Sequence, residues 1–152
     1  MAKRSAGILL FRDDDPLEFL LVHPGGPYWQ NKDEGAWSIP KGEIDLDSED
    51  PLERAIQEFD EEIGFEPEGD FIPLGSLKQK GGKTVEAWGL EGDLPAGHRI
   101  ECNTFEMEWP PNSGQTKSFP EIDEARFFPE PEARKKINPA QADFFDRLKE
   151  RI

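Results

Sequence analysis

Apolar runs separated by polar turns open the chain in the manner of paired strands. Residues 5–11 are small and apolar, residues 12–16 are charged and end in proline, and residues 18–23 return to apolar side chains. Short apolar runs bounded by turn residues are typical of buried strands. We therefore expect a β-hairpin here, followed by a polar, glycine-rich loop over residues 24–35 and a short strand over residues 37–39.

A helical period replaces this pattern after Asp50. Asp50 precedes Pro51, and Glu53 stands three residues after the aspartate, which is the arrangement of an N-cap, a first-turn proline and a capping-box glutamate. Gly64 is the residue type that most readily ends a helix in the left-handed conformation. Between these ends the apolar side chains share one stripe, which predicts a helix packed on a sheet: Leu52, Ala55, Ile56, Phe59 and Ile63.

Strand patterns resume downstream of the helix. Residues 71–78 and 83–90 flank a Gly-Gly pair and predict a second hairpin, and residues 99–109 and 125–128 predict further strands. Asn138, followed by proline and by apolar residues at helical spacing, predicts a terminal amphipathic helix.

This order of elements predicts an α/β (α+β) fold in which a mixed β-sheet is sandwiched between helices. The 152 residues fit one domain, residues 1–152, and no change in composition marks a second.

The charge balance restricts the classes of partner. Eighteen Lys and Arg residues face 33 Asp and Glu residues, for a net charge of −15. Such a chain repels a nucleic-acid polymer and an anionic membrane, and a polyphosphate substrate must bring cations or meet a local positive pocket. The first apolar run is too short for a membrane span or signal core, so we expect a cytoplasmic protein. We expect it to be a monomer or a homodimer. Cys102 is the only cysteine, which excludes an intrachain disulfide framework.

Three glutamates crowd one turn of the predicted helix. Glu58 and Glu62 are four residues apart and Glu61 is adjacent, on the flank of the apolar stripe rather than opposite it. A divalent cation would offset their repulsion, and carboxylates favour hard cations such as Mg²⁺ or Mn²⁺. The alternative is a solvated acidic face on a plain interaction domain.

Residues 42–65 resemble the signature of the Nudix hydrolases, which runs Gly, five residues, Glu, seven residues, and then Arg-Glu-apolar-x-Glu-Glu-x-Gly-apolar. Here seven residues after Glu49 comes the stretch Gln57-Glu58-Phe59-Asp60-Glu61-Glu62-Ile63-Gly64-Phe65. Gln57 replaces the family arginine, which braces the loop against the helix, and six residues instead of five separate Gly42 from Glu49. Both departures concern the loop and leave the glutamates in place.

The resemblance implies metal-dependent hydrolysis of a phosphoanhydride bond in a nucleoside diphosphate-linked substrate, with water as the nucleophile. The cation, Mg²⁺ or Mn²⁺, would be held by four groups: Glu58, Glu61, Glu62 and the carbonyl of Gly42. Glu61 is the nearest candidate for the general base, and family members also recruit a glutamate from a distant loop. Glu106 and Glu108 are rivals for that role because they share one face of a predicted strand; otherwise that face is simply solvated.

Candidate substrate contacts come from the few basic and aromatic positions outside the helix. Lys41, Lys80 and Lys83 could bind phosphates, although lysines at a hairpin tip also serve solubility. Tyr28 is a candidate for stacking on a base, although large aromatics are also core residues.

The opening of the chain, residues 5–12, most resembles diadenosine tetraphosphate hydrolases within the family. Dinucleoside polyphosphates are therefore the favoured substrates, followed by nucleoside triphosphates and nucleotide sugars of the ADP-ribose type. The alternative function is a non-catalytic nucleotide or metal sensor on the same fold, for which Gln57 and the longer loop are the indications.

Overall fold

The computed structural model describes residues 4–44, 50–79, 82–94, 98, 102 and 104–152. Its strands are β1 (Arg4–Arg12), β2 (Glu18–Pro24), β3 (Lys41–Glu43), β4 (Ile72–Lys78), β5 (Thr84–Glu91), β6 (Thr104–Glu108), β7 (Thr116–Pro120) and β8 (Ile122–Pro129). Its helices are α1 (Pro51–Ile63), α2 (Glu130–Lys136), the short 3₁₀ turn η2 (Pro139–Gln141) and α3 (Asp143–Lys149).

β1 is the central strand of a mixed sheet. It pairs in parallel with β5 along its length, while its other edge pairs with β3 near the start and with β2 near the end. The path through the sheet is β4-β5-β1-β2-β8, and β4–β5 and β2–β8 are antiparallel. The two predicted hairpins and the predicted fold class are thereby confirmed.

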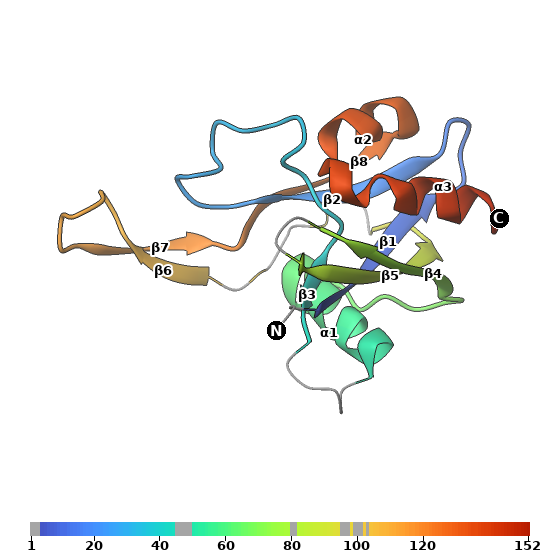
Figure 1. Ribbon diagram of the computed structural model, residues 1–152, viewed down its shortest axis with the longest axis horizontal. Coiled ribbons are helices and arrows are strands. Elements are labelled where there is room, and N and C mark those ends of the chain that lie inside the picture. Colours follow the sequence, from blue (N-terminus) through green and yellow to red (C-terminus); the bar gives the residue numbers. More distant parts are fainter. Residues whose placement is uncertain (1–3, 45–49, 80–81, 95–97, 99–101, 103) are drawn as a thin grey trace.

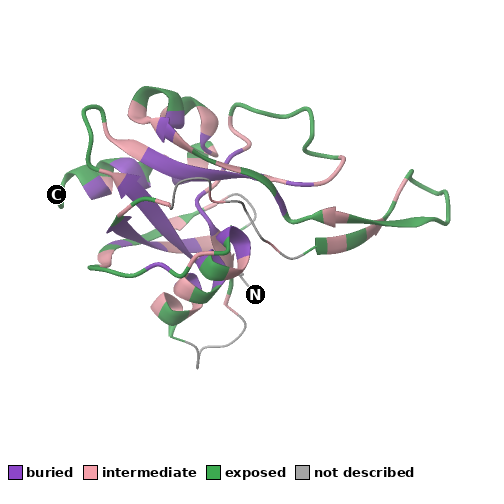
Figure 2. Ribbon diagram, turned by 180° about the vertical axis from the view of Figure 1, so that it is seen from behind, coloured by how far each residue is buried: buried purple, intermediate pink, exposed green. Residues whose placement is uncertain are grey.

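Helices cover both faces of this sheet (Figure 1). Because alternate side chains of a strand point to opposite faces, β1 contributes to two cores. Leu9 and Phe11 pack in the cluster that includes Phe144 and Phe145 of α3, whereas Ile8 packs in the cluster of α1. Figure 2 shows the sheet buried between these layers, so α1 has a fixed position on one face.

The sheet opens between β1 and β2, and this opening creates the site. The two strands pair only beside their turn, at Phe11 and Arg12. Residues 37–44 run between them further on, where the Ile8 amide donates to the Pro40 carbonyl at 3.1 Å and the Val22 amide to the Ser38 carbonyl at 2.8 Å. The inserted segment brings β3 against α1.

The prediction of a regular strand over residues 37–39 is wrong. Trp37 and Ser38 form only isolated bridges, to Ile137 and Val22 respectively, and the regular strand begins later, at Lys41. Because Trp37 and Ser38 bridge to different segments, no ladder of consecutive pairs forms over residues 37–39.

A two-stranded ribbon of β6 and β7 projects from the body of the molecule (Figure 1). β6 accounts for part of the strand predicted over residues 99–109, of which residues 99–101 and 103 lie outside the described residues. β7 and α2 were not predicted, since β7 is mostly exposed and polar and α2 is short. The predicted terminal helix starts later than expected: the Asn138 side chain caps η2, and α3 follows.

The described helices include none with both the length and the apolar character that a membrane crossing requires.

Candidate active site

Helix α1 is held rigidly at both ends. The Asp50 side chain accepts a hydrogen bond from the Leu52 amide at 3.1 Å, and Gly64 ends the helix at φ 78°. Ala55, Phe59 and Ile63 are buried on the sheet, as the apolar stripe predicted. This docking turns the flank of the helix, with its glutamates, toward β3.

Glu58 lies directly against the backbone of Gly42. A Cβ placed on Gly42 would fall 2.0 Å from Cδ of Glu58 and 2.4 Å from its Oε2, so only glycine allows this approach. The other carboxylate oxygen, Oε1, is paired with Arg54 one turn earlier on the helix. Glu58 is 9% exposed, and its Oε2 is thus confined beside the glycine of β3.

Glu62 is the most perturbed carboxylate of the site. Its Oε2 accepts a hydrogen bond from the Lys41 amide at 3.2 Å, and the residue is 8% exposed. Burial, and then repulsion by Glu58, raise the pKa of Glu62 to about 8; Lys41 opposes this rise and Glu121 adds to it. Burial and the neighbouring carboxylates thus disfavour the charged form of Glu62, and a bound cation would offset both effects.

Glu61 is oriented differently from its two neighbours. Its Oε1 accepts a hydrogen bond from Nε2 of Gln57 at 2.9 Å on the exposed side of the helix. Within the described part of the chain, no three acidic, histidine or cysteine side chains are arranged as a ready metal cluster. The structure brings Glu58, Glu62 and Gly42 together, and it does not bring Glu61 into one cluster with them.

The remaining pair of carboxylates still fits Mg²⁺ or Mn²⁺. Such ions bind commonly through one or two carboxylates, with water and substrate phosphates as the other ligands. Oε2 of Glu58, the Glu62 carboxylate and the Gly42 backbone supply that donor set, all of it oxygen. The raised pKa of Glu62, caused by burial and by the charge of Glu58, agrees with this fit because a cation would stabilise the charged carboxylate.

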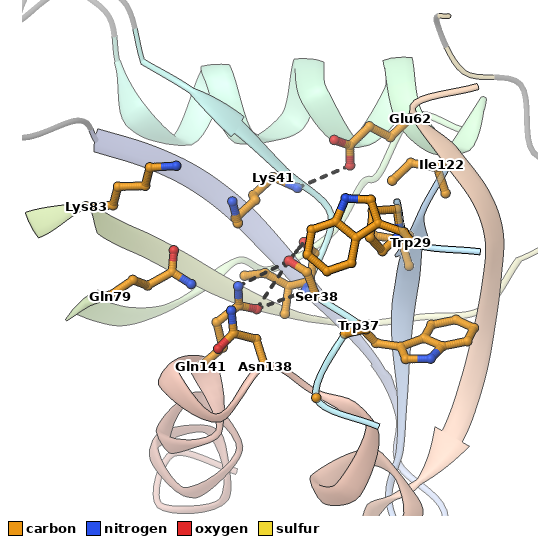
Figure 3. Close-up of a pocket in the computed structure, with 15 residues that line it drawn as sticks. Trp29, Trp37, Ser38, Lys41, Glu62, Gln79, Lys83, Ile122, Asn138 and Gln141 are labelled. Atoms are coloured by element: carbon orange, nitrogen blue, oxygen red, sulfur yellow. Dashed lines mark hydrogen bonds between the residues drawn. The ribbon is translucent and has the colours of Figure 1, made fainter. Parts of the chain in front are cut away.

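A pocket of about 350 Å³ opens beside Glu62 (Figure 3). Lys41 and Lys83 supply its cationic side, and Trp29 supplies an aromatic ring. Burial lowers the pKa of Lys41; the Glu62 carboxylate opposes this effect and Lys83 adds to it. Two ammonium groups therefore stand near each other in one pocket, which is an arrangement suited to an anion such as a phosphate.

A buried amide forms the floor of the pocket. Oε1 of Gln141, which is 1% exposed, accepts from the Ile39 amide at 3.1 Å, and its Nε2 donates to Oγ of Ser38 at 3.1 Å. Figure 3 shows Gln141 and Asn138 side by side below this segment. η2 thus fixes the inserted segment that leads to Lys41.

The four residues expected to contact substrate have different outcomes. Lys41 and Lys83 line the pocket, while Lys80 lies outside the described residues. Tyr28 does not line the pocket: it is 61% exposed and its ring meets Trp109 edge-on at 5.7 Å. The neighbouring Trp29 lines it instead, and its amide donates to the Gly26 carbonyl at 3.2 Å, which closes a turn at this residue.

Glu106 and Glu108 lie on β6 in the projecting ribbon, and neither lines the pocket. Glu108 accepts a hydrogen bond from the Asn112 amide at 2.6 Å. A different carboxylate approaches the site: Glu121, between β7 and β8, acts electrostatically on Glu62. Its backbone carbonyl accepts from the Gly25 amide at 2.9 Å, which fixes the loop. No local signal marked Glu121, because its electrostatic effect on Glu62 comes from a residue distant in sequence.

Comparison with known proteins agrees with this geometry. The sequence model of the NUDIX domain matches residues 1–148. The chain belongs to the Nudix family. As a Nudix protein it is assigned to the pyrophosphohydrolases of that family, and no curated protein was found to match the sequence.

Solved Nudix structures share the fold at low sequence identity. A C. elegans Ap4A hydrolase binary complex is 18% identical with a TM-score of 0.66, covering 98% of this chain and 96% of its own. The NUDIX domain of Shewanella oneidensis NrtR complexed with ADP ribose is 14% identical with a TM-score of 0.65, covering 99% and 88%. A MutT protein from Methanosarcina mazei Go1 is 20% identical with a TM-score of 0.62, covering 99% and 94%.

The Nudix motif is thus distributed over two elements that face each other. Gly42 lies on β3, and residues 58–64 form the last turns and the end of α1. Glu49 and the extra loop residue lie outside the described residues. Gln57, at the position of the family arginine, is exposed and contacts Glu61 rather than β3.

Proposed function

We propose that this Nudix protein hydrolyses a phosphoanhydride bond in a nucleoside diphosphate-linked substrate, with Mg²⁺ or Mn²⁺ as cofactor. The observation that carries the proposal is one pocket in which Glu62 stands at the end that adjoins Glu58 and Gly42, and Lys41 and Lys83 stand within. An acidic end suits a cation, and a basic side suits the phosphates that the cation accompanies.

Each group has a distinct part in this reaction. Glu58, Glu62 and the Gly42 carbonyl would hold the cation, which polarises the phosphate and lowers the pKa of the attacking water. Lys41 and Lys83 would bind the phosphate oxygens and offset the negative charge that grows on them. Trp29 offers a ring, 40% exposed, on which a nucleobase can stack.

The general base is proposed to be Glu121 or Glu61. Glu121 acts on Glu62 from a separate loop, whereas Glu61 is on α1 and is engaged by Gln57. Replacing the true base by glutamine should lower kcat about 100-fold or more. Glu106→Gln and Glu108→Gln on the ribbon are the matched controls, and an equal loss in either would contradict this assignment.

Dinucleoside polyphosphates are the favoured substrates, followed by nucleoside triphosphates and nucleotide sugars of the ADP-ribose type. The opening residues of the chain support this order, as does the similarity in fold to an Ap4A hydrolase. The partner is accordingly a small nucleotide-like molecule.

The test is phosphate release across a panel of these three classes with Mn²⁺, coupled to pyrophosphatase or phosphatase. Turnover of one class that collapses in Glu62→Gln and persists in Glu106→Gln would support the proposal and name the substrate class. Intact ligand after prolonged incubation, together with a metal-dependent rise in melting temperature, would instead support the non-catalytic sensor. That alternative draws on the hydrogen bond by which Gln57 engages Glu61.

A further inference from the structure

Three consecutive residues of β3 each contact helix α1. The Lys41 amide donates to Glu62 at 3.2 Å, and Gly42 lies against the carboxylate of Glu58. At the next residue, the Glu43 carbonyl accepts a hydrogen bond from Nε of Arg54 at 3.2 Å. The glycine is therefore fixed between two hydrogen bonds, one on each side.

Arg54 contributes more than one of these contacts. While its Nε binds the Glu43 carbonyl, its terminal nitrogen forms an ion pair with Oε1 of Glu58. The Arg54 side chain is 23% exposed and that of Glu58 is 12% exposed, so water screens this pair less than a surface pair. One planar guanidinium thus sets both the strand backbone and the carboxylate that faces it.

The pairing also fixes where the second oxygen of Glu58 lies. Arg54 engages Oε1, whereas Oε2 is the oxygen beside Gly42. An arginine that binds one oxygen fixes the rotation of the carboxylate and thereby the direction of the other. Partners of this kind set the orientation of metal ligands, and their loss commonly weakens metal binding 10- to 100-fold.

Gln57 does not make these contacts. It is exposed, lies one turn further along α1, and its amide is bonded to Glu61. Among the described residues, the side-chain hydrogen bond from α1 to the Glu43 carbonyl comes from Arg54.

We propose that Arg54 is a positioning residue for the cation site, holding Gly42 and Glu58 in the relative geometry that divalent-cation binding requires. The inference rests on the proposed function, because it assigns the cation to Glu58, Glu62 and Gly42. It adds a residue outside the signature positions to the groups that build the site.

The test is Mn²⁺ affinity, measured without substrate by electron paramagnetic resonance of the free ion. Arg54→Met keeps the length of the side chain and removes both contacts, and it should weaken Mn²⁺ binding about 10-fold or more. Arg54→Lys, which keeps the charge but loses the fork, should fall between this variant and the wild type. Arg134→Met is the matched control, since Arg134 forms the same kind of i,i+4 pair with Glu130 on α2, away from the site.

Melting temperatures measured in EDTA show how much each substitution destabilises the fold, separately from its effect on Mn²⁺ affinity. The proposal expects Arg134→Met to lose stability yet keep the Mn²⁺ affinity of the wild type. Arg54→Met with an affinity within about twofold of the wild type would overturn it; if that variant fails to fold, wild-type affinity in Arg54→Lys would do the same. A wild type that binds no Mn²⁺ would overturn both the proposed function and the role of Arg54. Normal binding by the wild type and by Arg54→Met would overturn the role of Arg54 alone.

Discussion

The pKa of Glu62 predicts a strong competition between protons and metal. Burial and the charge of Glu58 raise that pKa to about 8, so the carboxyl is protonated over much of the neutral range. A cation ligand must be deprotonated, and metal binding must therefore release a proton whenever the pH lies below this value.

The size of the effect follows from the pKa. The apparent dissociation constant scales with one plus the ratio of protonated to deprotonated Glu62. For a pKa of about 8, binding of Mn²⁺ should be roughly 50-fold weaker at pH 6 than at pH 8 and nearly constant above pH 9. At pH 7 close to one proton should be released for each ion bound.

The raised pKa of Glu62 should also make the stability of the metal-free protein depend on pH. Because the folded pKa is raised from the ordinary 4.5, the stability that Glu62 contributes is complete below about pH 4.5 and is lost as the pH rises through about 8. At 1.36 kcal/mol per pH unit, the full loss is at most about 5 kcal/mol. Glu62→Gln, which cannot ionise, should lack this loss and exceed the wild type in stability at pH 9.

Two measurements check this reasoning. Isothermal titration with Mn²⁺ in two buffers of different ionisation enthalpy counts the protons released, and urea denaturation in EDTA follows stability from pH 5 to pH 9. A Mn²⁺ affinity that changes less than about threefold between pH 6 and pH 8 would refute the argument. So would equal pH dependence of stability in the wild type and in Glu62→Gln.

Three further substitutions test the supports of the site. Gly42→Ala should abolish detectable Mn²⁺ binding and cost about 1–3 kcal/mol in urea denaturation, because its Cβ would overlap Glu58; normal affinity would contradict the close approach. Gln141→Leu leaves the buried Ile39 amide without its acceptor and should cost about 1–3 kcal/mol in the same assay, whereas an unchanged midpoint would argue against that role. Asp50→Ala removes the N-cap of α1 and should lower the free energy of unfolding by about 1 kcal/mol. Its Mn²⁺ affinity should change little under conditions in which the variant is fully folded.

Local sequence was sufficient for the helix that carries the acidic groups. The cap at Asp50, the stop at Gly64 and the apolar stripe lie within one segment, and each acts through near neighbours. The stripe also put Glu58 and Glu62 on the buried flank, because side chains four residues apart lie together on a helix. The hairpins were predictable for the same reason, since each is closed by its own turn.

Residues that reach the site from other elements could not be found in this way. Tyr28 was the aromatic residue chosen from the sequence, yet the adjacent Trp29 lines the pocket, whereas Tyr28 contacts Trp109. Likewise, no local pattern separates Glu121, between β7 and β8, which acts electrostatically on Glu62, from Glu106, on β6 in the projecting ribbon.

Alternation along a strand predicts which side chains share a face, but it does not predict which other elements that face packs against. Arg54 lies outside the apolar stripe of α1, so the sequence alone marks it as a surface residue. Its hydrogen bond to the Glu43 carbonyl depends on where β3 packs against the helix. The sequence by itself determined the helix and its acidic flank, because these depend on short-range geometry, and it indicated Gly42 only through the resemblance to the Nudix signature. The tertiary structure decided which distant groups meet there, because those contacts depend on how β1 and β2 part to admit the segment between them.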